Sequence, residues 1–362
     1  MDFINAIYVA ALLFIVTYIY KVPISYYYLL LLHLATVFLT NDFLFPISYM
    51  PDQFRYINAA SGIRDALDFF NYDLYDRSEN VYRSALFFSL FPIPFIKTVF
   101  SISIINFFLY ALLFVFLYKK KILVGNAIWF YLLYPSLTLY AAIGGRDILI
   151  FVIMFLSVYQ LYLGRTILSI VISTPLLLIK SQNFIIFIVS IFIYRGIENK
   201  NIFSLRTLLV FIFAIAGLAV VSMLYSIEMI DVMRRNMYAE DGGDLQSYIP
   251  LMGYFDLLKS SVVGGLYMIL KPLPWESGSA MQFLQSFENM FIFYFIYKLI
   301  QEQRKIKDKF SLFLYSYLFV AMSIYGIVVF NYGTASRYKF TFIAIFIVFS
   351  MSIIYKNRRL KK

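Results

Sequence analysis

The sequence predicts an all-α integral membrane protein, a single helical bundle (residues 1–362) of about eleven transmembrane helices. Hydrophobic residues make up 62% of the 362 residues and charged residues only 14%, whereas soluble domains are roughly half apolar and a quarter charged. The 40 Phe and 32 Tyr residues suit lipid-facing helices and interfacial belts. Lysine and arginine gather in short segments between long apolar runs, as in the cytoplasmic loops of membrane proteins.

Apolar runs long enough to cross a bilayer follow one another along the chain, since about 20 helical residues span the hydrocarbon core. The first run is expected to be a retained span, because its cation, Lys21, follows it and no cleavage site appears. Two shorter apolar pieces, Ala85–Ile96 and Val262–Leu270, are expected to be interfacial or re-entrant. The expected spans are Phe3–Tyr20, Ile24–Thr40, Val99–Tyr118, Ile122–Ile143, Ile148–Leu163, Thr166–Ile179, Phe184–Tyr194, Leu205–Tyr225, Met281–Leu299, Phe310–Phe330 and Tyr338–Tyr355.

The distribution of basic residues sets the expected orientation, because cytoplasmic loops are enriched in lysine and arginine. With Lys21 inside, alternate loops carry most of the cations and few of the acids. The N-terminus is then outside and the C-terminus inside. This orientation requires two short spans within Thr166–Tyr194 that meet at Lys180. A single span there would put the basic segment after Lys298 outside.

Two outer loops are long, residues 41–83 and 226–280, and long loops in compact proteins are usually functional. Each contains apolar residues at helical spacing, at 57–70 and 230–237, which predicts an amphipathic helix on the membrane surface or over the bundle. The second of these helices carries the adjacent pair Arg234 and Arg235, which could bind lipid headgroups or a substrate.

Three tight outer turns each place a cation at the outer membrane boundary. They are GGRD at 144–147 with Arg146, KSQN at 180–183 with Lys180, and NYGTASRYK at 331–339 with Arg337. The positive-inside rule disfavours cations there, so we expect them to serve a lipid-linked phosphate or pyrophosphate rather than merely to snorkel. Arginine suits this role because its planar fork binds two phosphate oxygens at once.

Acidic and other polar residues provide further candidates. Asp52 near Arg55, and Asp147 beside Arg146, could orient these arginines or act as a general base. Within the expected spans, His33 and Glu288 could be bases, members of a proton path or helix–helix hydrogen-bonding groups. Asn106 is expected to form an inter-helix hydrogen bond only.

The sequence excludes several site classes. It contains no cysteine and a single histidine, which excludes disulfides, cysteine-ligated metals and histidine-rich metal sites. No phosphate-binding, dinucleotide-binding, zinc-protease or nucleophile-elbow motif appears, so no metal or cofactor is expected. The net charge of +11 follows the loop topology, so a nucleic-acid partner is not expected either.

The span plan, the two long outer loops and four short phrases resemble the Wzy-type polysaccharide polymerases, including the O-antigen and EpsG-like enzymes. DQFRY at 52–56 resembles their acid-and-tyrosine phrase early in the first outer loop. GRD at 145–147 resembles their arginine turn, and ASRY at 335–338 is similar to their late arginine phrase. LLLIKSQ at 176–182 resembles an apolar run followed by Arg-Pro-Gln, with lysine and serine in place of arginine and proline.

The resemblance implies a GT-C-like enzyme of the bacterial inner membrane with a periplasmic active face. It would transfer a growing glycan from undecaprenyl pyrophosphate to a lipid-linked repeat unit. Its other implied partners are membrane lipid and a chain-length regulator protein. Arg146, Arg337 and Lys180 would neutralise the leaving pyrophosphate without a metal. Asp52 and Asp147 complete the implied catalytic set. The implied substrate-binding residues are Arg55, Arg234, Arg235 and Tyr338.

Two other function classes stay open at this point. One is glycosyl transfer of another kind: a transferase using a polyprenyl-phosphate sugar, with Asp52 as the base, or an O-antigen ligase that uses the same donor with a lipid A core acceptor. The other is a flippase or transporter of lipid-linked sugars. Transport predicts charged residues along the interior of the bundle, whereas the unexplained charges here gather at the expected outer face.

Overall fold

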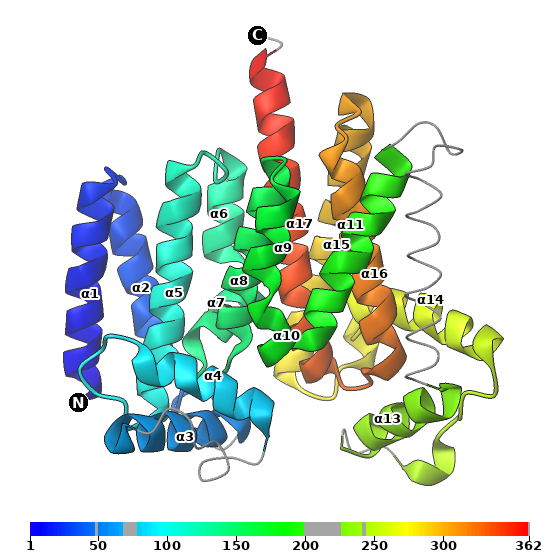
Figure 1. Cartoon of the computed structure of the whole chain (residues 1–362), viewed down its shortest axis with the longest axis horizontal. Helices are drawn as coiled ribbons and strands as arrows, with labels where there is room; N and C mark the ends of the chain where they lie inside the picture. Colours follow the sequence, from blue (N-terminus) through cyan, green and yellow to red (C-terminus); the bar gives the residue numbers. More distant parts are fainter. Residues whose placement is uncertain (48–49, 68–77, 199–225, 241–243, 361–362) are drawn as a thin grey trace. The chain divides into compact units, whose positions relative to one another are not determined.

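A computed structural model of the chain describes residues 1–47, 50–67, 78–198, 226–240 and 244–360 (Figure 1). These residues form helices joined by short connections, and no β-strand occurs among them. The all-α prediction is therefore confirmed for the described part of the chain. The expected span Leu205–Tyr225 lies outside it.

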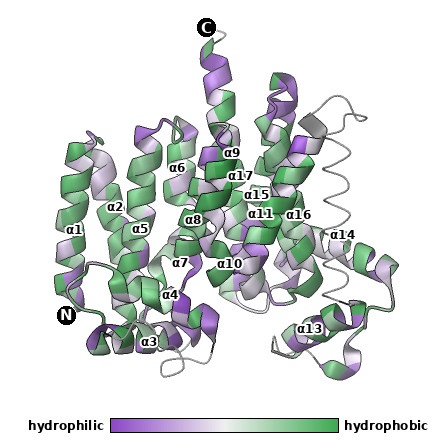
Figure 2. Cartoon of the chain, viewed as in Figure 1, coloured by the Kyte–Doolittle hydropathy of each residue, from purple (hydrophilic) through white to green (hydrophobic). Residues whose placement is uncertain are grey.

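Four described helices are long and apolar enough to cross a membrane. They are α1 (Asp2–Ile19), α5 (Val99–Lys119), α16 (Phe310–Val328) and α17 (Tyr332–Leu360). Figure 2 shows α1 and α5 hydrophobic over most of their length, with hydrophilic residues gathered at the C-terminal end of α17. By length and composition this supports a multi-pass membrane protein, and the larger number of eleven spans stays a prediction.

Shorter apolar helices occupy several of the other expected spans. The bounds of α2 (Ile24–Thr40) coincide with the expected span, and α8 (Asp147–Tyr162) begins one residue early. The expected span Met281–Leu299 lies within the longer helix α15 (Ala280–Ile306). Apolar runs thus locate most helices well, because burial in a bundle or in lipid selects the same residues.

Proline divides two of the expected spans. Ile122–Ile143 contains α6 (Asn126–Leu133) and α7 (Pro135–Ala142), with Tyr134 extended between them. Thr166–Ile179 contains α9 (Thr166–Ser173) and α10 (Pro175–Ile179). Proline has no N–H group and its ring clashes with the preceding helical turn, so it begins a helix more readily than it continues one.

The junction predicted at Lys180 is observed. Helix α10 ends at Ile179, and α11 (Ser181–Glu198) begins immediately after Lys180, whose φ of −155° and ψ of 76° are not helical. Two helices therefore meet at this lysine, as the charge distribution required.

The first of two compact units spans Met1–Phe184. Its centre is α5, which is buried along most of its length and contacts α1, α2, α7 and α8. The buried rings of Tyr110 and Tyr131 stack at 4.9 Å, and each hydroxyl donates to the other residue's backbone carbonyl. These reciprocal bonds satisfy two polar groups that would otherwise be costly in an apolar core.

The first outer loop contributes a helix pair to the same unit. Helix α3 (Asp52–Ala66) packs against α4 (Glu79–Leu90). The expected amphipathic helix at 57–70 is thus present but begins earlier and ends at Ala66, with Leu67 in the left-handed conformation.

The second unit spans Ile185–Lys362 and contains α13 (Ile227–Glu240), α14 (Tyr254–Leu270), α15, α16 and α17. Helix α13 confirms the amphipathic helix expected at 230–237. Helices α14 and α16 cross at glycines: a Cβ on Gly264 would lie 2.0 Å from the Gly326 carbonyl oxygen. Only two residues without side chains allow backbones to approach so closely.

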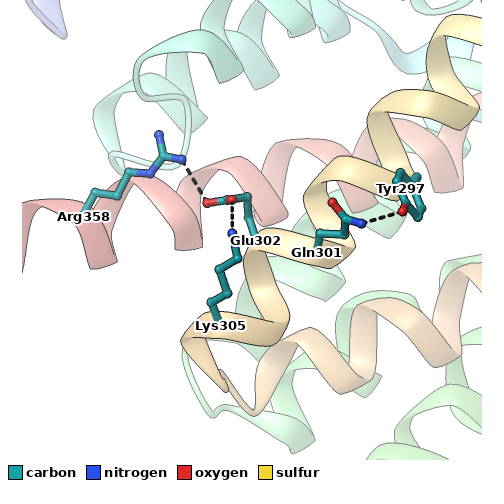
Figure 3. Close-up of polar contacts among 5 residues, drawn as sticks. All are labelled: Tyr297, Gln301, Glu302, Lys305 and Arg358. Carbon is teal, nitrogen blue, oxygen red and sulfur yellow. Dashed lines mark hydrogen bonds and ion pairs between the residues drawn. The ribbon is translucent and has the colours of Figure 1, made fainter.

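Charged residues join the C-terminal ends of α15 and α17 (Figure 3). The Glu302 carboxylate accepts hydrogen bonds from Lys305 at 2.9 Å and Arg358 at 3.0 Å. The bond from Lys305, and to a smaller extent the bond from Arg358, lowers the pKa of Glu302 below its ordinary value. Because all three side chains are exposed, we expect this network to set the alignment of the helix ends more than the stability.

Candidate functional site

Two buried asparagines hold the GGRD turn between α7 and α8. The Asn106 side chain on α5 donates to the carbonyls of Ile143 at 2.7 Å and Gly145 at 2.6 Å. Asn41, at the end of α2, donates to the Ala142 carbonyl at 2.8 Å. Asn106 thus forms hydrogen bonds as expected, but their acceptors lie in the turn between α7 and α8 that precedes Arg146 and not in a second helix.

A third buried amide links this turn to the first outer loop. The Gly144 N–H donates to the side-chain oxygen of Gln53 at 2.7 Å. A Cβ on Gly144 would lie 3.0 Å from that oxygen and 3.1 Å from the Val99 carbonyl, so only glycine fits without displacement. Gln53 is the second residue of α3, and the bond therefore brings the start of α3, with Asp52, to the turn.

Arg146 joins the turn to the junction between α10 and α11. Its Nη1 donates to the carbonyl of Ile179 at 2.9 Å, and Ile179 directly precedes Lys180. The structure therefore places two of the three predicted cation-bearing turns next to each other. We call the three segments 52–53, 144–147 and 179–180 the Arg146 cluster.

The four charged residues of the Arg146 cluster are half-buried, and its other four residues are buried. Among the described residues, the Ile179 carbonyl is the only hydrogen-bond partner of the Arg146 side chain, which leaves further N–H donors for an anion. Asp147 and Asp52 are the first residues of α8 and α3, where a carboxylate is favoured by the helix dipole. This placement gives both acids a structural role in addition to the predicted chemical one.

The C-terminal end of α3 is held by the segment between α4 and α5. Arg64 on α3 donates to the Ile93 carbonyl at 2.7 Å, and Lys97 pairs with Asp65. The hydrogen bond from Lys97 lowers the pKa of the exposed Asp65 carboxyl. The segment after α4 is also fixed to α1, because Asn5 exchanges two hydrogen bonds, of 2.8 and 3.1 Å, with the backbone of Phe95.

The tight turn expected at 331–339 is wrong, because the helix α17 already begins at Tyr332. Arg337 and Tyr338 therefore lie in the first turns of α17, in the second unit, and both are half-buried. The Tyr338 ring packs on Tyr325 with ring centroids 4.7 Å apart. The structure thus brings together Arg146 and the Lys180 junction within the first unit, whereas their association with Arg337 remains a prediction.

Arg234 has a structural function in the second unit. Its Nε donates to the Ile327 carbonyl at 3.1 Å and its Nη1 to the Ile249 carbonyl at 2.7 Å. The guanidinium also lies 5.1 Å from the centre of the Phe330 ring. Arg234 therefore fastens α13 to the C-terminal end of α16, whereas its neighbour Arg235 is exposed. Substrate binding by either residue stays a prediction.

The two ionisable residues predicted within spans have defined surroundings. His33 has its ring nitrogens 2.8 Å from the Leu29 carbonyl and 2.7 Å from the Leu132 carbonyl, which fits a hydrogen-bonding group between helices. Glu288 interacts electrostatically with Lys339 on α17. In the described ranges, no group of three His, Cys, Asp or Glu side chains is arranged to hold a metal ion.

The structure also reveals three residues that the sequence analysis did not select: Asn41, Gln53 and Lys339. Gln53 lies within the DQFRY phrase and Lys339 is the last residue of the NYGTASRYK segment, so both were close to selected residues. The only feature of the sequence that marks these three residues is a polar side chain next to an apolar run. It could not single them out, because their partners lie far away in sequence.

Comparison with known proteins gives no match for this chain, whether with family models, curated proteins or solved structures. The resemblance to polysaccharide polymerases therefore stays an interpretation of the sequence.

Proposed function

We propose that the chain is a membrane-embedded polysaccharide polymerase that moves a growing glycan from undecaprenyl pyrophosphate to a lipid-linked repeat unit on the periplasmic face. The observation that carries the proposal is the hydrogen bond from Arg146 to the Ile179 carbonyl. It joins two turns that each contain a cation, and it leaves donors of the arginine fork for phosphate oxygens.

The proposed reaction is a substitution at the anomeric carbon of the donor sugar. A hydroxyl of the acceptor sugar attacks that carbon, the bond to the pyrophosphate oxygen breaks, and undecaprenyl pyrophosphate leaves with the bonding electrons. The hydroxyl proton passes to a carboxylate, for which Asp52 and Asp147 are the candidates. Arg146, Lys180 and Arg337 stabilise the charge that develops on the leaving pyrophosphate.

A second candidate is a glycosyltransferase that uses a polyprenyl-phosphate sugar. It is favoured by the bond between Gln53 and Gly144, which brings the carboxylate-bearing start of α3 to the arginine turn. In such an enzyme Asp52 is the base and a single phosphate needs fewer cations. An O-antigen ligase is a close variant with a different acceptor.

A deletion strain distinguishes a polymerase, a ligase and a flippase through its surface polysaccharide, separated by gel electrophoresis. Loss of a polymerase leaves core with a single repeat unit. Loss of a ligase leaves bare core and polymer on its lipid carrier, and loss of a flippase leaves neither product. Restoration of the polymer by the wild-type chain, but not by the Arg146→Ala variant at equal membrane level, supports the polymerase. A deletion strain with unchanged polymer contradicts all three functions.

A further inference from the structure

Lys339 is a buried lysine inside the second unit. It lies on α17, has only 2% of its surface exposed, and is surrounded by residues of α14 and α15. Its Nζ donates to the Met268 carbonyl at 2.9 Å and to the Asn289 side-chain oxygen at 2.7 Å. A lysine is rarely buried, because removing its charge from water is strongly unfavourable unless hydrogen-bond or charge partners replace the lost solvation.

Asn289 extends the network to a second carbonyl of the same region. Its side-chain nitrogen donates to the Lys271 carbonyl at 2.7 Å. Met268 lies in the last turn of α14 and Lys271 is its C-terminal cap, so neither carbonyl receives a hydrogen bond from a further helical turn. A cation is favoured at this end of a helix, where the partial charge is negative.

The network lies inside the bundle rather than at its end surface. Lys339 is seven residues after Tyr332, the first residue of α17, which is about 10 Å along a helix that rises 1.5 Å per residue. Asn289 is nine residues after Ala280, the first residue of α15. Helix α14, which contains the apolar piece expected to be interfacial or re-entrant, therefore has its C-terminal end held between two other helices.

We propose that Lys339 is a positioning residue for Arg337: its bonds to the end of α14 and to α15 fix the rotation and axial position of α17. Residues two positions apart on a helix point about 200° away from each other, since each residue turns the helix by about 100°. With Lys339 held against α14 and α15, Arg337 leaves the opposite side of α17. The inference rests on the proposed function, in which Arg337 binds the donor pyrophosphate.

The first test measures the position of residue 337 without using the enzyme activity. The chain contains no cysteine, so Arg337→Cys gives a single labelling site for a membrane-impermeant maleimide. We expect Lys339→Met to change the labelling rate several-fold per inserted protein, because the hydrogen bonds that hold the start of α17 against α14 and α15 are lost. The matched control is Lys259→Met, which makes the same change at an exposed lysine of α14 and should leave the rate unchanged.

Asn289→Leu removes the same link while keeping the lysine, and it should change the labelling as Lys339→Met does. It also serves if Lys339→Met is poorly inserted. Equal labelling rates in all four backgrounds would overturn the positioning role. A changed labelling rate in both Lys339→Met and Asn289→Leu supports the positioning role, whether or not the protein proves to be a polymerase.

The second test asks whether Lys339 acts through Arg337, by measuring polymer length in the deletion strain. Lys339→Met and Arg337→Ala should each shorten the glycan. The double variant should be no worse than Arg337→Ala alone, because residues that act as one unit lose their effect together. If the loss of polymer in the double variant equals the product of the two single losses, Lys339 acts independently of Arg337. If Arg337→Ala alone leaves full-length polymer, the proposed function fails while the labelling result still stands.

Discussion

Arg146 and Ile179 are joined by a hydrogen bond of 2.9 Å, from the guanidinium of the first to the backbone carbonyl of the second. The two residues precede the starts of α8 and α11, and each is next to a charged residue, Asp147 and Lys180. The bond therefore couples two helix junctions that both carry charge.

Removal of the Arg146 guanidinium should reduce polymer synthesis by roughly a hundred- to a thousand-fold, the effect of losing one donor to a developing oxyanion, ~2.7–4 kcal/mol. Arg146→Lys should also be harmful, because an ammonium group cannot replace the bidentate fork. Polymer length per inserted protein is the measurement, and Arg165→Ala, at an exposed arginine, is the control. Normal insertion and full-length glycan in both Arg146→Ala and Arg337→Ala would refute the pyrophosphate site.

Lys180→Arg should be tolerated better than Lys180→Ala. Arginine keeps the positive charge at the junction of α10 and α11, and it is the residue that the resembling polymerases have at this place. The same assay of polymer length tests this expectation. Equal activity of the two variants would mean that the charge at this junction takes no part in the reaction.

The carboxylates should separate into a chemical and a structural role. Asp52→Asn and Asp147→Asn each keep the shape of the side chain but remove a charge at a helix start, which costs about 0.3–1 kcal/mol of stability. Loss of activity well beyond that effect, at normal expression, identifies the base. If both variants polymerise normally, neither carboxylate is the proton acceptor.

The glycine crossing of α14 and α16 should tolerate no side chain. In Gly264→Ala the new Cβ would meet the Gly326 carbonyl, so the helices must separate, with an expected loss of about 1–3 kcal/mol as for other overpacked cores. Thermal unfolding in detergent measures this. Gly253→Ala is the matched control, because no atom lies within 4 Å of its Cβ position. Equal melting temperatures would show that the crossing is not so close.

Reporter fusions test the orientation on which the periplasmic site depends. A fusion at Gly242 should be active in the periplasm, and a fusion at Lys362 should be active in the cytoplasm, because basic residues gather on the side of the C-terminal tail. The reverse pattern at either position would put the Arg146 cluster on the wrong face for lipid-linked periplasmic substrates.

Local chemistry made much of the helical framework predictable from sequence. The bounds of α2 follow from one continuous apolar run, and the junction at Lys180 follows from the alternation of basic loops. The divisions at Pro135 and Pro175 were available in the sequence but are hidden by hydropathy, which does not register a missing N–H group.

The candidate site was predictable only residue by residue. Arg146 and Lys180 could be selected as cations in outer turns, but their proximity depends on how α8, α10 and α11 pack. The bond between Gln53 and Gly144 joins residues 91 positions apart, and no local pattern marks Gln53 as the partner. Lys339 could be seen as a charge near the start of a span, whereas its burial depends on α14 and α15.

In the proposed polymerase, Asn106 has a consequence for how the donor phosphate binds. Its amide nitrogen donates to the carbonyls on both sides of Gly144, so the turn is restrained on both sides of this glycine. An arginine on such a turn is already in place before any ligand arrives. Little conformational entropy is then lost at this point on binding, and the free energy of the phosphate contact is left almost undiminished for the reaction itself.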